Sequence, residues 1–161
     1  MSKLDVNLTI NGAARRAAAE PRLTLLDFLR DEMNLAGTHT GCEHGVCGAC
    51  SILLDGVPIR ACLMLAVQAE GCHITTVEGL CQSDGTPGVL QDAFIEAHGM
   101  QCGYCTPGML ISAQALLAGN ASPSLDEIKD AIGGNLCRCT GYVQIIEAIQ
   151  LAAQRLREAQ P

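Results

Sequence analysis

The sequence has no tryptophan, and only two phenylalanines and two tyrosines occur among its 161 residues. Large aromatic side chains therefore cannot anchor the core, which Ala, Leu, Ile and Val must fill. A domain of half this length built from such residues is marginally stable unless something cross-links it. The composition fits a protein stabilised by bound metal, because metal binding contributes directly to folding.

Basic residues are also scarce: Lys and Arg number 10 against 17 Asp and Glu, which gives a net charge of −7. Nucleic acid binds to basic patches, so we expect no nucleic-acid partner. No apolar run approaches the length of a membrane span, and the first residues lack the layout of a signal peptide. We therefore expect no membrane insertion and a cytoplasmic location, where grouped cysteines indicate metal ligands and not disulfides.

Cysteine, in contrast, is abundant, and eight of the ten cysteines fall into two groups of unlike spacing. The first cysteine set has the C-x4-C-x2-C opening of plant-type [2Fe–2S] ferredoxins and comprises Cys42, Cys47, Cys50 and Cys62. A zinc knuckle or a disulfide is the alternative, but three cysteines within nine residues are closer than structural zinc pairs. The two cysteines outside the groups, Cys72 and Cys81, are expected to be small buried hydrophobes.

The second cysteine set combines a C-x2-C with a C-x-C and comprises Cys102, Cys105, Cys137 and Cys139. Its arms precede predicted helix starts at Thr106-Pro107 and Thr140-Gly141, where exposed N–H groups and the helix dipole favour thiolates. Zinc remains an alternative at this set, because two close cysteine pairs are also a zinc pattern. A thioredoxin-like motif is disfavoured, since no βαβ pattern surrounds the first arm.

The pattern of apolar residues changes along the chain and predicts an α+β fold. In the first part, alternation and turn dipeptides predict a small mixed sheet, with strands at 4–10, 15–20, 51–54, 57–60 and 74–77. One helix opens at Thr24, with Asp27 completing a near capping box. After about residue 78, helical spacing predicts four helices at 89–97, 108–117, 125–132 and 143–156.

Capping and turn residues refine the expected helix boundaries in this second part. Thr106-Pro107 suits an N-cap followed by proline, and Ser124 with Glu127 forms a capping box. Residues 81–88 are rich in Ser, Asp, Gly and Pro and are the expected linker. The two domains predicted are therefore 1–80 and 81–161, each with one cysteine set.

Three strings in the chain closely resemble the small iron–sulfur subunit of the xanthine oxidase family of molybdenum hydroxylases. They are GCEHGVCGAC at 41–50, QCGYCTPG at 101–108 and GNLCRCTGY at 134–142. The resemblance extends over essentially the whole chain and shows no departure at any cysteine of the two sets. It implies a β-grasp, plant-type ferredoxin-like domain followed by an all-α four-helix-bundle [2Fe–2S] domain.

The resemblance also implies an electron-transfer function without catalytic residues in this chain. In such enzymes a large subunit holds molybdopterin and oxidises an aldehyde, an N-heterocycle or carbon monoxide. Electrons pass through the cluster of the second cysteine set and then that of the first to FAD on a medium subunit. The implied assembly is a heterotrimer that forms (αβγ)2.

Two residues acquire a role toward the pterin through the same resemblance. Gln101 matches a glutamine that hydrogen-bonds the pterin, and Cys139 matches a cysteine whose sulfur faces the pterin amino group. An amide can both donate to and accept from a pterin edge, although capping of a helix end is an alternative for Gln101. The competing functions are a free-standing two-cluster ferredoxin and a zinc-stapled scaffold.

Overall fold

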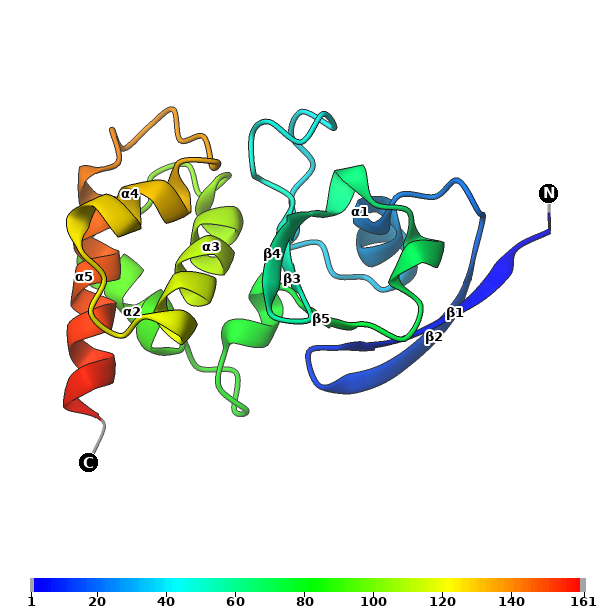
Figure 1. Ribbon diagram of the computed structural model, residues 1–161, viewed down its shortest axis with the longest axis horizontal. Coiled ribbons are helices and arrows are strands. Elements are labelled where there is room, and N and C mark those ends of the chain that lie inside the picture. The colour runs from blue at the N-terminus through cyan, green and yellow to red at the C-terminus, as the bar shows by residue number, and fades with distance from the viewer. Residues whose placement is uncertain (1, 160–161) are drawn as a thin grey trace.

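A computed structural model describes residues 2–159 and places them in two parts that lie side by side (Figure 1). One part contains a five-stranded sheet and a short helix, and the other contains four helices, so the predicted α+β class is confirmed. The strands are β1 (Leu4–Ile10), β2 (Ala13–Ala19), β3 (Ser51–Leu54), β4 (Val57–Arg60) and β5 (His73–Thr75). The α-helices are α1 (Leu25–Asp27), α2 (Val89–Glu96), α3 (Thr106–Gly119), α4 (Leu125–Ile132) and α5 (Val143–Glu158). Short π- and 3₁₀-helical segments are η1 (Phe28–Glu32), η2 (Ala61–Leu63), η3 (Ala66–Ala69) and η4 (Val77–Leu80).

The sheet has the strand order β2-β1-β5-β3-β4 and is mixed, because β1 and β5 pair in parallel while the other neighbours are antiparallel. The dipeptide Asn11-Gly12 joins β1 to β2, and both residues have positive φ, 50° and 79°. A type I′ hairpin turn requires such angles at both central residues. The strand predicted at 74–77 begins one residue earlier and ends at Thr75, because the chain turns into η4 from Val77.

The helix predicted from Thr24 is correctly capped but shorter than a regular α-helix. The Thr24 side chain accepts a hydrogen bond from the Asp27 backbone N–H, 3.0 Å away, as a capping residue does. After one turn the segment widens into the π-helix η1. Phe28 and Leu29 are fully buried against the sheet, so the widened turn still delivers its apolar side chains to the core.

The four helices of the second part enclose their own core, which includes Phe94, Met109, Ile128 and Ile149. The capping box at the start of α4 is confirmed, since Ser124 and Glu127 bond each other's backbone N–H groups. The expected start of α3 is wrong by one residue: Cys105 is the N-cap, and the helix begins at Thr106 with proline second.

The two cores approach each other across one seam. From the first part, η4 packs its Val77 and Leu80 side chains against the helical core. From the second part, α3 lies against β3 and β4. None of the helices within residues 2–159 is both long and apolar enough to cross a lipid bilayer.

Candidate metal centres

The first cysteine set lies on an irregular loop in the sheet part. Residues 41–50 form neither helix nor strand, and the β3–β4 hairpin returns the chain so that η2 carries Cys62 back to the loop. The thiols interact in two pairs, Cys42 with Cys47 and Cys50 with Cys62. Cys47 and Cys50 also interact, so the two pairs face one another.

Backbone N–H groups of this loop point at sulfur. The N–H groups of His44 and Cys47 donate to the Cys42 Sγ at 3.3 and 3.4 Å. These bonds, that from Cys47 above all, lower the pKa of Cys42 to about 6, because they stabilise the thiolate. Burial has the opposite effect on Cys50 and raises its pKa to about 11. A bound metal would have to displace the proton from Cys50, whereas Cys42 is already a thiolate at neutral pH.

Two glycines of this loop lie where a larger side chain would meet neighbouring atoms. A Cβ added at Gly41 would lie only 2.7 Å from the Cys47 Sγ. At Gly45, φ is +76°, and an added Cβ would meet Leu63 at 2.4 Å. Gly41 is therefore favoured by the small space beside the Cys47 sulfur, whereas Gly45 is favoured by its backbone conformation, since the exposed end of Leu63 is free to turn away.

The second cysteine set is assembled from two chain segments that are distant in sequence. Cys102 and Cys105 immediately precede α3, and Cys137 and Cys139 precede α5. The Sγ atoms of Cys139 and Cys102 lie 3.5 Å apart, and the Cys105 and Cys137 side chains interact as the other pair. The fold thus brings together all four residues that the sequence predicted.

A cavity of about 240 Å³ lies at this set and extends to the first set. Its cysteine lining consists of the whole second set and Cys47 of the first. Gly41 and Ala49 supply further walls from the first loop, while Leu136 and Arg138 supply walls from the second arm. The two cysteine sets therefore share one region of the molecule, at the seam between the two parts.

The thiols of the second set also have unlike pKa values, because their surroundings differ. Burial raises the pKa of Cys105 to about 12, with the neighbouring Cys137 adding to the effect. Burial also acts to raise the pKa of Cys137, but bonds from the Thr140 hydroxyl and N–H outweigh it and leave the pKa lowered. The Tyr104 N–H is the main cause of a lowered pKa at Cys102.

The donor chemistry fits binuclear iron better than single metal ions. All ten cysteines are free thiols in the structure, so none of the eight is consumed in a disulfide. Over residues 2–159, no three His, Cys, Asp or Glu side chains converge closely enough to hold one ion. A structural zinc site needs four such ligands, whereas each iron of a [2Fe–2S] cluster takes two protein sulfurs. Two pairs of thiols per set match the second requirement.

Gln101 lies beside the second set and faces outward. Its side chain is exposed and makes no hydrogen bond within the described part of the chain, so the capping alternative finds no support. Cys102 and Cys139 are exposed on the same side of the set, while Cys105 and Cys137 are partly buried. This half of the second set is open to a partner.

The structure corrects one expectation for the two remaining cysteines. Cys72 is partly buried, but Cys81 is exposed in the linker and is not a core residue. Neither lines the cavity between the sets.

Sequence reasoning missed the polar contacts that join the helical part to the sheet part. Asn135 is 1% exposed and reaches Ser51 of β3 and Ser112 of α3. Tyr104 stacks on His39, with ring centroids 4.8 Å apart, and its hydroxyl donates to the Thr40 carbonyl oxygen. No local motif marks Asn135 in the sequence, because its partners lie on other elements.

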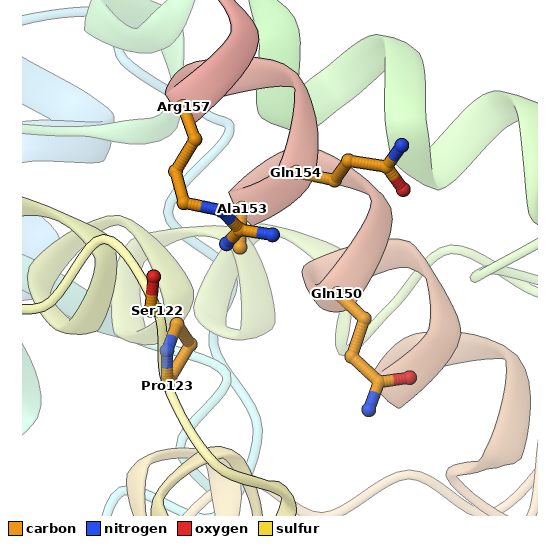
Figure 2. Close-up of a pocket in the computed structure, with 6 residues that line it drawn as sticks. All are labelled: Ser122, Pro123, Gln150, Ala153, Gln154 and Arg157. Carbon is orange, nitrogen blue, oxygen red and sulfur yellow. The ribbon is translucent and has the colours of Figure 1, made fainter.

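A larger cavity, of about 430 Å³, lies between α5 and the loop that follows α3 (Figure 2). Figure 2 shows Gln150, Gln154 and Arg157 on α5 opposite Ser122 and Pro123. The Arg157 guanidinium donates to the Ala121 carbonyl oxygen at 2.8 Å, which ties the loop to α5. This cavity contains no cysteine and has no part in the metal centres.

Comparison with known proteins identifies both parts. The family described as "2Fe-2S iron-sulfur cluster binding domain" matches residues 8–83, and that described as "[2Fe-2S] binding domain" matches residues 76–150. The chain is 56% identical over 153 residues to caffeine dehydrogenase subunit gamma of Pseudomonas sp. (strain CBB1), covering 93% of this chain and 91% of that one. It is 48% identical to the nicotinate dehydrogenase small FeS subunit of Eubacterium barkeri, covering 96% and 98%. A chain in the crystal structure of quinoline 2-oxidoreductase from Pseudomonas putida 86 superposes with a TM-score of 0.94, at 50% identity and full coverage of both chains.

These features together define an iron–sulfur protein with two [2Fe–2S] domains. The chain belongs to the small iron–sulfur subunits of the xanthine oxidase family of molybdenum dehydrogenases, and its role is electron transfer within an oxidoreductase.

Proposed function

We propose that the eight cysteines of the two sets ligate the two [2Fe–2S] clusters, one cluster in each set. The observation that carries this proposal is the arrangement of the thiols of each set as two pairs, which matches two protein sulfurs on each iron. When bound, each cluster supplies a centre that accepts and releases one electron. The thiols supply paired sulfur ligands, and the N–H groups directed at Cys42 and Cys137 stabilise negative charge there.

Electrons are proposed to enter at the second set, from molybdopterin on a large subunit. Gln101, Cys102 and Cys139 are exposed on one side of this set, which leaves them available to a partner's cofactor. The Gln101 amide offers both a donor and an acceptor to a pterin edge, and the Cys139 sulfur offers an acceptor to its amino group.

Electrons are proposed to leave at the first set, toward FAD on a medium subunit. Val46 in the first loop and Leu63 in η2 are 65% and 66% exposed, although both are apolar. Neighbouring exposed apolar side chains favour a surface that a partner covers. Such a surface supports an integral subunit over a free-standing ferredoxin.

The proposed substrate of the assembled enzyme is an N-heterocycle, ahead of an aldehyde or carbon monoxide. Caffeine, nicotinate and quinoline, in the names of the similar proteins, are all N-heterocyclic compounds. Assays of the assembled enzyme with quinoline, nicotinate and benzaldehyde, using a dye as acceptor, test this choice. Preference for benzaldehyde would contradict it.

The proposed organisation is a β-grasp ferredoxin-like domain over 1–80 and a four-helix-bundle domain over 81–161. The two family matches overlap at 76–83, which supports a boundary in this region. We further propose a heterotrimer with the two larger subunits, doubled to (αβγ)2, in the cytoplasm.

Low-temperature EPR of the dithionite-reduced protein tests the proposed ligation. Two S = 1/2 signals, each near one spin per chain, are expected, whereas zinc would give none. Purification at native expression levels tests the assembly: recovery only as a monomer, without flavin or molybdenum, would favour the free ferredoxin instead.

A further inference from the structure

A buried polar cluster crosses the seam between the two parts, directly beside both cysteine sets. The Ser51 hydroxyl lies 2.6 Å from the Gly48 carbonyl oxygen and 3.1 Å from Asn135 Oδ1. The Asn135 Nδ2 donates to the Ser112 Oγ at 2.5 Å. Arg60 closes the cluster, because its guanidinium donates to Ser51 Oγ at 2.6 Å. Asn135 is therefore bonded to β3 on one side and to α3 on the other.

One backbone hydrogen bond beside this cluster joins the two ligand loops. The Leu136 N–H donates to the Cys47 carbonyl oxygen at 2.8 Å. Leu136 is the neighbour of Cys137 in the chain, so a short path of bonds connects a first-set sulfur to a second-set sulfur. The path runs from the Cys47 side chain to its carbonyl, across this hydrogen bond, and through one peptide unit to Cys137.

The backbone segments around this hydrogen bond are tightly packed. A Cβ added at Gly48 would lie 2.0 Å from Asn135 Oδ1 and 2.6 Å from the Gly134 carbonyl oxygen. A Cβ added at Gly108, in the first turn of α3, would lie 2.3 Å from the Gly48 carbonyl oxygen. Three backbone segments thus meet where Asn135 sits, and the glycines let them approach.

We propose that Asn135 is a positioning residue for electron transfer: anchored to Ser51 and Ser112, it holds the Cys47–Leu136 hydrogen bond and so sets the coupling between the two clusters. This inference rests on the ligation proposed above. The transfer moves one electron from the centre of the second set to that of the first, with no bond made or broken. Its rate depends on the path between the sulfurs, which Asn135 fixes without touching either sulfur.

Arg60 supplies a second link across the seam. Its guanidinium also donates to the Gly134 carbonyl oxygen at 2.7 Å, next to Asn135 in the chain. The buried amide has partners on β3 and α3, and the arginine joins β3 to the segment that carries the amide. This leaves one favoured arrangement, because any sliding would leave buried polar groups unpaired.

The test is EPR on the assembled enzyme, purified with its partner subunits, as wild type, Asn135→Ala and Ser112→Ala. After full reduction, both S = 1/2 signals are expected in each protein, but their spin–spin splitting should weaken in Asn135→Ala. In rapid-freeze experiments, reduction of the first-set cluster after the second is expected to slow several-fold. Ser112→Ala removes one anchor only and should change both quantities in the same direction by less.

A matched control is Asn120→Ala, because the Asn120 amide also bonds Glu127 and the Ser122 N–H but lies at the far end of α3. It should leave both the splitting and the transfer rate at wild-type values. Wild-type splitting and rate in Asn135→Ala would overturn the proposal. If that variant loses a signal, Ser112→Ala decides, and an unchanged result there overturns it. A wild-type enzyme without two signals would instead refute the ligation itself.

Discussion

The first cysteine set occupies one loop and one short helix of the sheet part, whereas the second joins the starts of α3 and α5. Three first-set thiols lie within residues 42–50, so local glycine-rich backbone arranges most of that site. In the second set, α4 must return the chain before the two arms can meet. The first site is thus a property of a segment, and the second is a property of a folded domain.

The extreme thiol pKa values of the two sets have different causes. In the first set the exposed backbone N–H groups of the loop determine the lowest pKa, that of Cys42. In the second set burial by packed helices determines the highest, that of Cys105. Burial also raises the pKa of Cys50 in the first set, and local hydrogen bonds also lower the pKa of Cys102 and Cys137 in the second. Each set therefore combines thiols that local bonds prepare for metal with thiols that a bound metal would have to ionise.

The largest effect is expected from removing one ligand of either set. Cys105→Ala is expected to abolish the EPR signal of the second cluster and electron delivery through the assembled enzyme. Cys50→Ala is expected to abolish the signal of the first cluster. Each substitution should leave the other signal in place, because the two sets pack in separate hydrophobic cores. Cys72→Ala is the control and should retain both signals. Loss of both signals from one substitution would show that the sets do not form independently.

Thiol reactivity in the iron-free chain is expected to differ by on the order of a hundredfold between Cys42 and Cys105 at pH 7. A pKa of about 6 leaves Cys42 mainly ionised at that pH, and one of about 12 leaves Cys105 protonated. Alkylation of Cys42 should fall as the pH drops through 6, whereas that of Cys105 should keep rising above pH 10. Peptide mass spectrometry after iodoacetamide treatment measures both, with the exposed Cys81 as internal reference. Equal rates would contradict the difference in environment.

Gly48→Ala is expected to lower the free energy of unfolding more than Gly56→Ala. Both glycines have positive φ, +76° and +83°, so each alanine incurs about 1–2 kcal/mol of backbone strain. Only at Gly48 would the new Cβ meet packed atoms, and overpacking adds about 1–3 kcal/mol. Guanidinium unfolding followed by circular dichroism compares the two variants. Similar losses of unfolding free energy in the two variants would mean that the atoms around Gly48 rearrange without cost to accept a methyl group.

The smallest effect is expected from Ser124→Ala, which removes the side-chain cap of α4. Loss of such a cap costs about 1 kcal/mol of stability. Because α4 connects the arms of the second set, the second cluster should be lost at a lower temperature while the first is unchanged. EPR of samples heated to a series of temperatures, then reduced and frozen, follows the two losses. Ser83→Ala, in the exposed linker, provides the control and should change neither.

The unequal origin of the two sites explains what could be predicted from sequence. The hairpin turns, the α4 capping box and the Cys42–Cys50 spacing are local, and turn and capping chemistry determines them directly. The widening of the Thr24 helix into η1 could not be predicted, because it depends on how Phe28 and Leu29 meet the sheet.

The sequence also could not predict which cysteines pair with each other within each set. The spacing indicated which cysteines belong together, but not that Cys102 pairs with Cys139 across the fold. Asn135 carried no local motif of its own, and its partners Ser51 and Ser112 lie on other elements. Roles of this kind arise only when the two parts are packed against each other.

The return of the chain through α4 has a consequence for how the protein matures. Between Cys105 and Cys137 the chain closes a long loop, and a cofactor that bridges its ends restricts the disordered chain in the manner of a cross-link. Loading of iron at that end is therefore coupled to the collapse of the helices. At the other end, three of the four thiols lie within nine residues, so they need little of the remaining fold to come together.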